Sequence, residues 1–409
     1  MATPLEGIRI LDMSRILAGP WATQTMGDMG ASIIKVERPY MGDDSRIYGP
    51  PFLKGKEGDL KQTPMYLCAN RNKKSIAVDY TKPEGRDILL ELVKQSDVLI
   101  ENYKVGTLAR YGLGYEDVHK VNPRLVYCSL SGYGQSGPYA ERGATDPIIQ
   151  AMGGMMSMTG HPEGDPGGTP MKAGPSVVDI CAGLYAVIAI QGALYHRDLH
   201  GGSGQYIDLS LLDAGVAIMG QQAMHYFMSG TAPKRMGTGA NGGAPGGGFP
   251  CADGDIMIAP NSQDLYERMC KVIKMPELIT DERFQTNPKR VMNRAALIEL
   301  MNATTSQWKV RDLYDALNEA GVPCTPINTI EQVFEDPQVV HRNMTVESVH
   351  PQAAGKVRLM RSPIRYSDTK LDQYTAPPAT GEHTDEVLGG MPGIDKARLA
   401  QLRQAKIIQ

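Results

Sequence analysis

The sequence lacks an excess of basic residues and closely spaced cysteines. Its 409 residues include 42 Lys and Arg against 45 Asp and Glu, a net charge of −3. We therefore expect no nucleic acid or anionic membrane as a partner, and any anion site must be local. The six cysteines lie far apart with no Cys-x-x-Cys pair, which argues against a structural zinc or a disulfide framework. Reduced thiols predict a cytoplasmic protein.

The sequence also lacks a long uninterrupted hydrophobic run. Residues 1–16 do not combine a basic flank with a long apolar stretch, so we expect no signal peptide. The longest apolar run, residues 180–194, is interrupted by glycine, tyrosine and glutamine. Because a membrane span needs roughly 20 apolar residues, we predict a buried helix there instead.

Glycine and proline are abundant, with 45 and 28 residues respectively, and 42% of the chain is apolar. This composition excludes a coiled coil or helical repeat and favours a loop-rich enzyme whose backbone lies close to a ligand. At roughly 150 residues per domain, the length predicts two or three domains, or one large domain with an appendage.

The first 130 residues alternate between strand and helix patterns. Strands are predicted at 8–12, 32–36, 75–79, 97–101 and 124–130, and helices at 22–29 and 83–95. This alternation predicts the α/β class with a mostly parallel sheet, in which ligands bind at the carboxyl ends of the strands. Arg38, Asn102 and Ser131 stand at those ends.

Two apolar helices are predicted next, at 179–196 and 214–228, followed by a glycine-rich breaker at 229–248. A strand at 255–259 and amphipathic helices at 262–273, 293–304 and 309–320 predict a compact second unit. After Pro323 the pattern returns to strands and turns with many prolines.

Several familiar motifs are absent or incomplete. Residues 132–137 match the dinucleotide pattern Gly-x-Gly-x-x-Gly, but Pro138 and a polar loop follow where a helix should begin, which favours a plain turn. No His-Glu-x-x-His or Gly-x-Ser-x-Gly occurs, and the eight histidines are scattered, so we expect no metal site.

One carboxylate has an unusual position. Asp179 opens the predicted apolar helix after a Gly-Pro turn. It could be an N-cap, a position where Asp is preferred. It could also be a carboxylate nucleophile, placed where backbone N–H groups stabilise developing negative charge.

Sequence blocks from residue 4 to residue 388 resemble class III CoA-transferases, a family that includes formyl-CoA and carnitine CoA-transferases and α-methylacyl-CoA racemases. The blocks lie at residues 4–12, 18–20, 26–31, 34–37, 70–76, 98–103, 131–134, 321–323, 336–338 and 381–388. No block is decisive alone, but their number and order make chance implausible.

The resemblance implies an interlocked homodimer of two-domain subunits. A large Rossmann-like domain would have a mostly parallel sheet formed by both chain ends, beside a smaller α+β domain. The corresponding boundaries are 1–228 for the N-terminal part of the large domain, 229–330 for the linker and small domain, and 331–409 for the returning segment.

The resemblance also implies chemistry at Asp179. Its carboxylate would attack an acyl-CoA thioester, giving a mixed anhydride and then an aspartyl-CoA thioester, from which CoA passes to a small carboxylic acid. A dicarboxylate is the expected acceptor because such acids are common in the family. CoA and acyl-CoA would be substrates, with no tightly bound cofactor.

The family's CoA groove maps onto sixteen residues of this chain: Ile16, Leu17, Ala18, Arg38, Val78, Asp79, Tyr80, Thr81, Asn102, Tyr103, Lys104, Arg110, Gly143, Ala144, Thr145 and Asp146. Two positions depart from the formyl-CoA transferase pattern, which has glutamine in place of Leu17 and lysine in place of Thr81. Both departures weaken an oxalate-specific function and leave the CoA site intact.

Residues 241–248 correspond to the family's glycine loop, which closes over the aspartyl intermediates; Gly242, Gly243, Gly246, Gly247 and Gly248 would supply its mobility. A plain flexible linker would suit the same position.

The racemases of the family have a histidine immediately before the aspartate corresponding to Asp146, and this chain has Thr145 there. Transfer is therefore favoured over racemisation, and a non-catalytic nucleotide-binding protein is the third alternative.

Overall fold

A computed structural model describes residues 2–240 and 242–409. The chain divides into two compact units. The first contains Met1–Gly153, Gly174–Met219 and Asn343–Gln409, and the second contains Gly154–Ala173 and Gly220–Arg342. The predicted small domain at 229–330 lies wholly in the second unit, which also takes in residues 154–173 and reaches residue 342.

The first unit is built around a six-stranded sheet in the order β5-β2-β1-β6-β7-β8, and every neighbouring pair is parallel. The α/β class with a parallel sheet is therefore confirmed. The strands are β1 (Arg9–Asp12), β2 (Ser32–Glu37), β5 (Lys73–Ala77), β6 (Val98–Glu101), β7 (Val126–Ser131) and β8 (Tyr206–Ser210). Strand β8, a half-exposed edge strand whose central residue is Asp208, was not predicted from the sequence.

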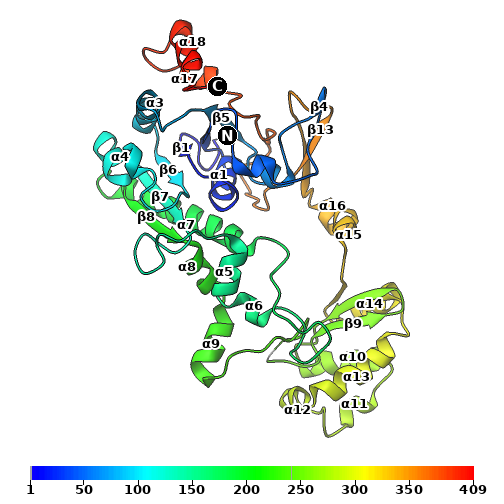
Figure 1. Ribbon diagram of the computed structural model, residues 1–409. Helices are drawn as coiled ribbons and strands as arrows, with labels where there is room; N and C mark the ends of the chain where they lie inside the picture. Colours follow the sequence, from blue (N-terminus) through cyan, green and yellow to red (C-terminus); the bar gives the residue numbers. More distant parts are fainter. Residues whose placement is uncertain (1, 241) are drawn as a thin grey trace. The chain divides into compact units, whose positions relative to one another are not determined.

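Helices cover both faces of this sheet (Figure 1). Alternate strand residues point to opposite faces, so Ile10 joins one core and Leu11 the other. The first face carries α1 (Ala18–Asp28), α5 (Asp146–Met152), α7 (Val177–Leu199) and α8 (Leu211–Ala217). The second face carries α3 (Pro83–Lys94), α4 (Tyr115–Val121), α17 (Thr384–Leu388) and α18 (Lys396–Gln404).

Both chain ends belong to the first unit. All six strands of its sheet nevertheless come from residues 9–210, so the expectation that both ends supply strands to the sheet was wrong. The C-terminal segment instead adds α17, α18 and a single antiparallel bridge between Val78 and Ile408. Its own strands, β12 (Thr345–Val349) and β13 (Lys356–Met360), form a separate hairpin. The stretch between β13 and α17 contains Pro363, Pro377 and Pro378, and prolines cannot donate the hydrogen bonds of a sheet.

Helix α7 is long and apolar enough to cross a membrane by length and composition alone. One side packs against α1, where Ala182 and Ala186 are fully buried. Gly183 permits this close approach, because a Cβ there would lie 2.7 Å from the carbonyl oxygen of Ala18. The opposite side exposes Ile188 and Tyr195, so the predicted buried helix is buried on one side only.

The second unit is α+β, with an antiparallel sheet in the order β11-β10-β9. Its strands are β9 (Gly247–Cys251), β10 (Gly254–Ile258) and β11 (Cys324–Pro326). Its helices are α6 (Met155–Met158), α9 (Gly220–Ser229), α10 (Gln263–Val272), α11 (Glu277–Thr280), α12 (Asn287–Met292), α13 (Arg294–Thr305), α14 (Val310–Glu319), α15 (Ile330–Glu335) and α16 (Pro337–His341). The three predicted amphipathic helices correspond to α10, α13 and α14.

The predicted helix at 214–228 was wrong in its continuity. The chain forms α8 and α9 with a break at residues 218–219, and Gly220 begins α9 with φ +45°.

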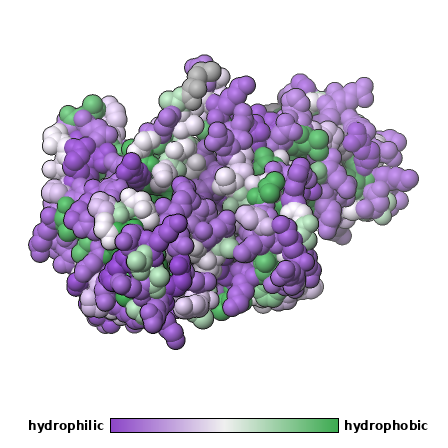
Figure 2. Space-filling model, turned by 90° about the horizontal axis from the view of Figure 1, so that it is seen from above, coloured by the Kyte–Doolittle hydropathy of each residue, from purple (hydrophilic) through white to green (hydrophobic). Residues whose placement is uncertain are grey.

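The remaining short elements of the first unit are η1 (Asp44–Ile47), η2 (Ala109–Tyr111), α2 (Pro64–Leu67) and the pair β3 (Lys54–Gly55) and β4 (Gly58–Asp59). On the face seen in Figure 2, hydrophilic residues predominate and apolar residues are scattered among them.

Candidate active site

A cavity of about 320 Å³ lies at the carboxyl edge of the sheet in the first unit. The segments that follow β1 and β6 and the end of β7 supply its walls, together with the first turns of α5 and α7. The cavity brings together eleven of the predicted site residues: Ile16, Leu17, Ala18, Asn102, Tyr103, Lys104, Gly143, Ala144, Thr145, Asp146 and Asp179. Four further residues line it that were not predicted from the sequence: Arg15, Tyr48, Met65 and Arg142.

Asp179 is partly buried in the first turn of α7. It is not the N-cap, because Ser176 holds that position and gives no side-chain cap. The cap comes from Asp146, which accepts hydrogen bonds from the backbone N–H groups of Val178 (2.9 Å) and Asp179 (3.2 Å). Burial, followed by the neighbouring charge of Asp146, raises the pKa of Asp179 to about 7.

The turn between β1 and α1 forms the wall around Ile16, which has φ +69°. This left-handed conformation is unfavourable for a β-branched residue and persists only where other contacts hold it. Asn102 holds the turn by accepting from Arg15 N and donating to Arg15 O, both at 2.8 Å. Asp43 accepts from Ile16 N at 3.1 and 3.3 Å.

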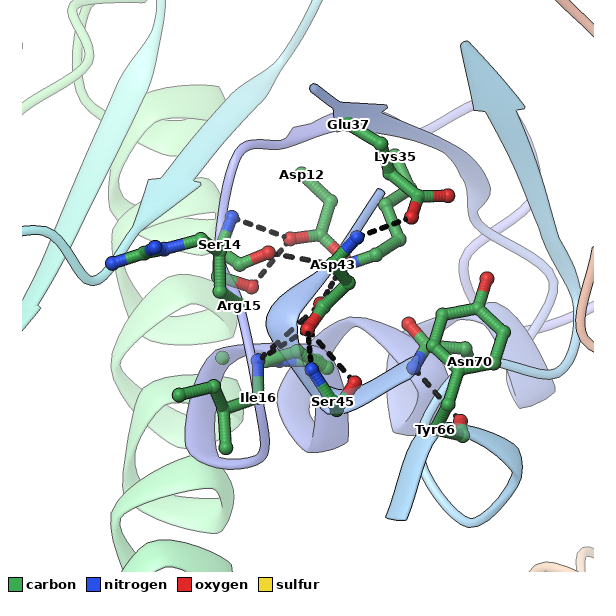
Figure 3. A network of polar contacts seen from close by, with 12 residues as sticks. Asp12, Ser14, Arg15, Ile16, Lys35, Glu37, Asp43, Ser45, Tyr66 and Asn70 are labelled. Carbon is green, nitrogen blue, oxygen red and sulfur yellow. Dashed lines mark hydrogen bonds and ion pairs between the residues drawn. The ribbon is translucent and has the colours of Figure 1, made fainter. Parts of the chain in front are cut away.

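Asp43 belongs to a buried charge network beneath this turn (Figure 3). Lys35 contacts Asp43 at 2.8 Å, Lys73 contacts Asp12 at 3.0 Å, and Arg46 contacts Glu37 at 2.7 Å. Burial alone would raise the pKa of Asp43, but Lys35 and hydrogen bonds from Ser45 lower it below its usual range. The network therefore anchors the cavity wall through ionised side chains.

The network was missed at the sequence level, although one signal was available. Lys35 stands between Ile34 and Val36 in a strand buried on both sides, where an unpaired charge would be costly. A lysine in such a strand indicates a buried carboxylate partner, but local spacing cannot say which one.

The other predicted CoA residues lie outside this cavity. Arg38 and Asp79 line a second cavity of about 380 Å³ near α3. Tyr80 packs edge-on against Tyr103 and Tyr111, and Arg110 lies in η2. The Val78 side chain is fully buried, and Asp79 accepts from the Thr81 backbone and hydroxyl.

The predicted glycine loop lies in the second unit, and its first residue, Asn241, is outside the described residues. Gly247 and Gly248 are not in a loop: they begin β9 and pair with Ile258 and Met257. Gly243 forms an isolated antiparallel bridge with Ala240, and Gly242 and Gly246 lie outside helices and strands. Across residues 2–240 and 242–409, no three His, Cys, Asp or Glu side chains are grouped as metal ligands.

The first unit is thus an α/β domain with a carboxylate-bearing cavity at the carboxyl edge of its sheet. The sequence profile of CoA-transferase family III matches residues 5–384. The chain belongs to this family of CoA-transferases.

Its relatives cover nearly the whole chain. It is 41% identical over 393 residues to succinate–glutarate CoA-transferase of Agrobacterium fabrum, covering 96% of this chain and 97% of that one. It is 39% identical to human succinyl-CoA:glutarate CoA-transferase, covering 99% and 90%. Among solved structures, a CAIB/BAIF family protein of Brucella suis has a TM-score of 0.85 at 43% identity, covering 95% of this chain and 99% of that one.

Proposed function

We propose that this enzyme transfers CoA from a dicarboxylyl-CoA to a second dicarboxylic acid, with succinyl-CoA and glutarate as the first pair to test. The observation that carries the proposal is the partly buried carboxylate of Asp179 in the cavity. The similar enzymes of A. fabrum and human are named for succinate, succinyl-CoA and glutarate, which supports the choice of acids.

In the proposed mechanism, Asp179 attacks the thioester carbonyl and expels CoA thiolate, leaving a mixed anhydride. The thiolate then attacks the aspartyl carbonyl, which releases the donor acid and leaves an aspartyl-CoA thioester. The acceptor carboxylate attacks this thioester and expels the thiolate again, forming a second anhydride. Attack of the thiolate on the acceptor's acyl carbonyl gives the new acyl-CoA and restores Asp179. The donor's acyl group leaves as the free acid, but every intermediate keeps one activated bond, an anhydride or a thioester.

Each step develops negative charge on a carbonyl oxygen, and α1 offers donors for it. Ala18 and Gly19 begin α1 without a side-chain cap, and first-turn N–H groups have no acceptor within the helix. Ala18 also lines the cavity. We therefore assign the N–H group of Ala18 to oxyanion stabilisation.

The exposed apolar side of α7 supports a homodimer as the working form. Ile188, Tyr195 and Leu199 are each more than half exposed on this helix, and a row of exposed apolar side chains is typical of a contact with another protein. A cytoplasmic location and the absence of a tightly bound cofactor are further parts of this proposal.

A mass-spectrometric screen tests the proposed activity. The purified protein is incubated with succinyl-CoA and, separately, glutarate, oxalate, malate or itaconate. We expect glutaryl-CoA to form. Free CoA should not accumulate, because in the proposed mechanism each expelled thiolate attacks a carbonyl again. No exchange with any of these acids would contradict the proposal. Deuterium uptake at the α-carbon of a 2-methylacyl-CoA in heavy water would support racemisation instead.

A further inference from the structure

The second cavity, about 380 Å³, carries an excess of positive charge. Its lining includes three basic residues, Arg38, Lys82 and Lys406, and one acidic residue, Asp79. A small cavity of about 10 Å³ shares Arg38 with it, and shares Arg15 and Tyr103 with the cavity of Asp179. The three cavities are therefore neighbours, which is the arrangement that an elongated ligand requires.

The C-terminal segment forms one wall of this cationic cavity. Asp79 N donates to Ile407 O at 2.8 Å, and Gln409 N donates to Ala77 O at 3.2 Å, which holds the segment beside β5 (Figure 1). Ile407 and Ile408 are buried in the core. These hydrogen bonds and buried side chains fix the backbone position of Lys406.

The three cations have different partners. Arg38 forms an ion pair with Asp44. The Lys82 ammonium donates to the carbonyl oxygens of Ala405 and Lys406 at 2.8 and 3.2 Å, so it holds the C-terminal segment. Lys406 has no ion pair within the part of the chain that the structure describes, and its side chain is exposed at the cavity.

Lys82 is also the N-cap residue of α3, so the backbone on this side of the cavity is fixed at the start of a twelve-residue helix. A lysine ammonium stabilises phosphate as a point charge, which suits the exposed side chain of Lys406.

We propose that Lys406 is a further substrate-binding residue, whose ammonium contacts a phosphate group at the nucleotide end of the acyl-CoA. The inference rests on the proposed function, because it takes the ligand of these neighbouring cavities to be an acyl-CoA. It makes the C-terminal segment part of the substrate site, with Lys82 as the residue that positions it.

The test replaces Lys406 by Asn. Lys406 has φ +55°, a conformation that Asn tolerates, so the backbone should keep its path. Deleting the segment would instead remove Ile407 and Ile408 from the core and confuse binding with folding. Lys396→Asn is the matched control, since Lys396 is exposed on α18 and lines neither cavity.

Steady-state constants are measured with three donors: succinyl-CoA, its dephospho-CoA analogue and succinyl-pantetheine. For Lys406→Asn we expect a KM for succinyl-CoA about fivefold higher with kcat unchanged, and no change with succinyl-pantetheine. An effect that disappears with the dephospho donor assigns the contact to the 3′-phosphate, and one that persists assigns it to the diphosphate. Lys406→Arg should retain the wild-type KM.

An unchanged KM for succinyl-CoA in Lys406→Asn, or an equal rise with succinyl-pantetheine, would overturn the inference. Failure of the proposed function looks different, because the wild-type protein would then transfer CoA from none of the three donors.

Discussion

Replacing Asp179 by Asn is expected to lower the rate of CoA transfer by at least ~10⁴-fold, because a carboxamide cannot attack a thioester to form the anhydride. The variant is nearly isosteric and Asp179 lies at the cavity surface, so CoA should still bind. Initial rates by chromatography and CoA affinity by calorimetry separate the two effects. Transfer at more than a small fraction of the wild-type rate would exclude Asp179 as the nucleophile.

The same variant should be more stable than the wild-type protein in alkaline solution. The folded state raises the pKa of Asp179 from 3.8 to about 7, so it binds this proton more tightly than the unfolded chain does. The resulting stabilisation is present below pH 4 and is lost as the pH rises through 7. The carboxamide of the Asp179→Asn variant cannot ionise. The melting temperature of the variant should therefore be higher than that of the wild-type protein at pH 8, and this difference should disappear at pH 4. Lower stability at pH 8 would indicate that the loss of activity reflects structural damage.

The second large effect is a dependence of transfer on pH. The nucleophile must be ionised, so kcat/KM should fall about tenfold for each pH unit below 7 and level off above it. The cause is mainly the burial of Asp179 and secondarily the charge of Asp146. The profile is measured from pH 5 to 9 at constant ionic strength. A flat profile would contradict the raised pKa.

Asp146→Asn tests the secondary cause. The amide oxygen can still accept from Val178 N and Asp179 N, so the start of α7 should remain capped. Removing the like charge should move the acid limb to lower pH, while burial keeps its midpoint above the ordinary value for aspartate. Because Asp146 also lines the cavity, the readout is the midpoint and not the rate. An unmoved midpoint would mean that burial alone sets the ionisation.

Much of the first unit could be predicted from local sequence patterns. The predicted strands overlap five strands of the parallel sheet, among which β2 and β6 are rich in β-branched residues, and α3 begins at Pro83 as its sequence indicates. The edge strand β8 escaped detection because Tyr206–Ser210 is only partly apolar. The break between α8 and α9 was not predicted because an apolar pattern continues across it.

The site was less accessible to local patterns, because its contacts join distant parts of the chain. Asp179 could be read as an N-cap or a nucleophile; the structure shows that Asp146, 33 residues earlier, supplies the cap. Lys35 and Asp43 pair through the fold, and Asn102 fixes a turn 87 residues away. Such pairings depend on strand order, which periodicity does not encode. The role of Asp179 as a nucleophile was therefore expected from the family resemblance and not from the spacing of residues.

The most direct measurement concerns the covalent state of Asp179 during turnover. The protein is incubated with succinyl-CoA, quenched with hydroxylamine, digested and examined by mass spectrometry, with Asp179→Asn as the control. The proposed mechanism predicts a hydroxamate on the wild-type peptide that contains residue 179, and none on the variant's peptide. An unmodified peptide from wild-type protein that is turning over, or a hydroxamate on another residue, would contradict the aspartyl mechanism.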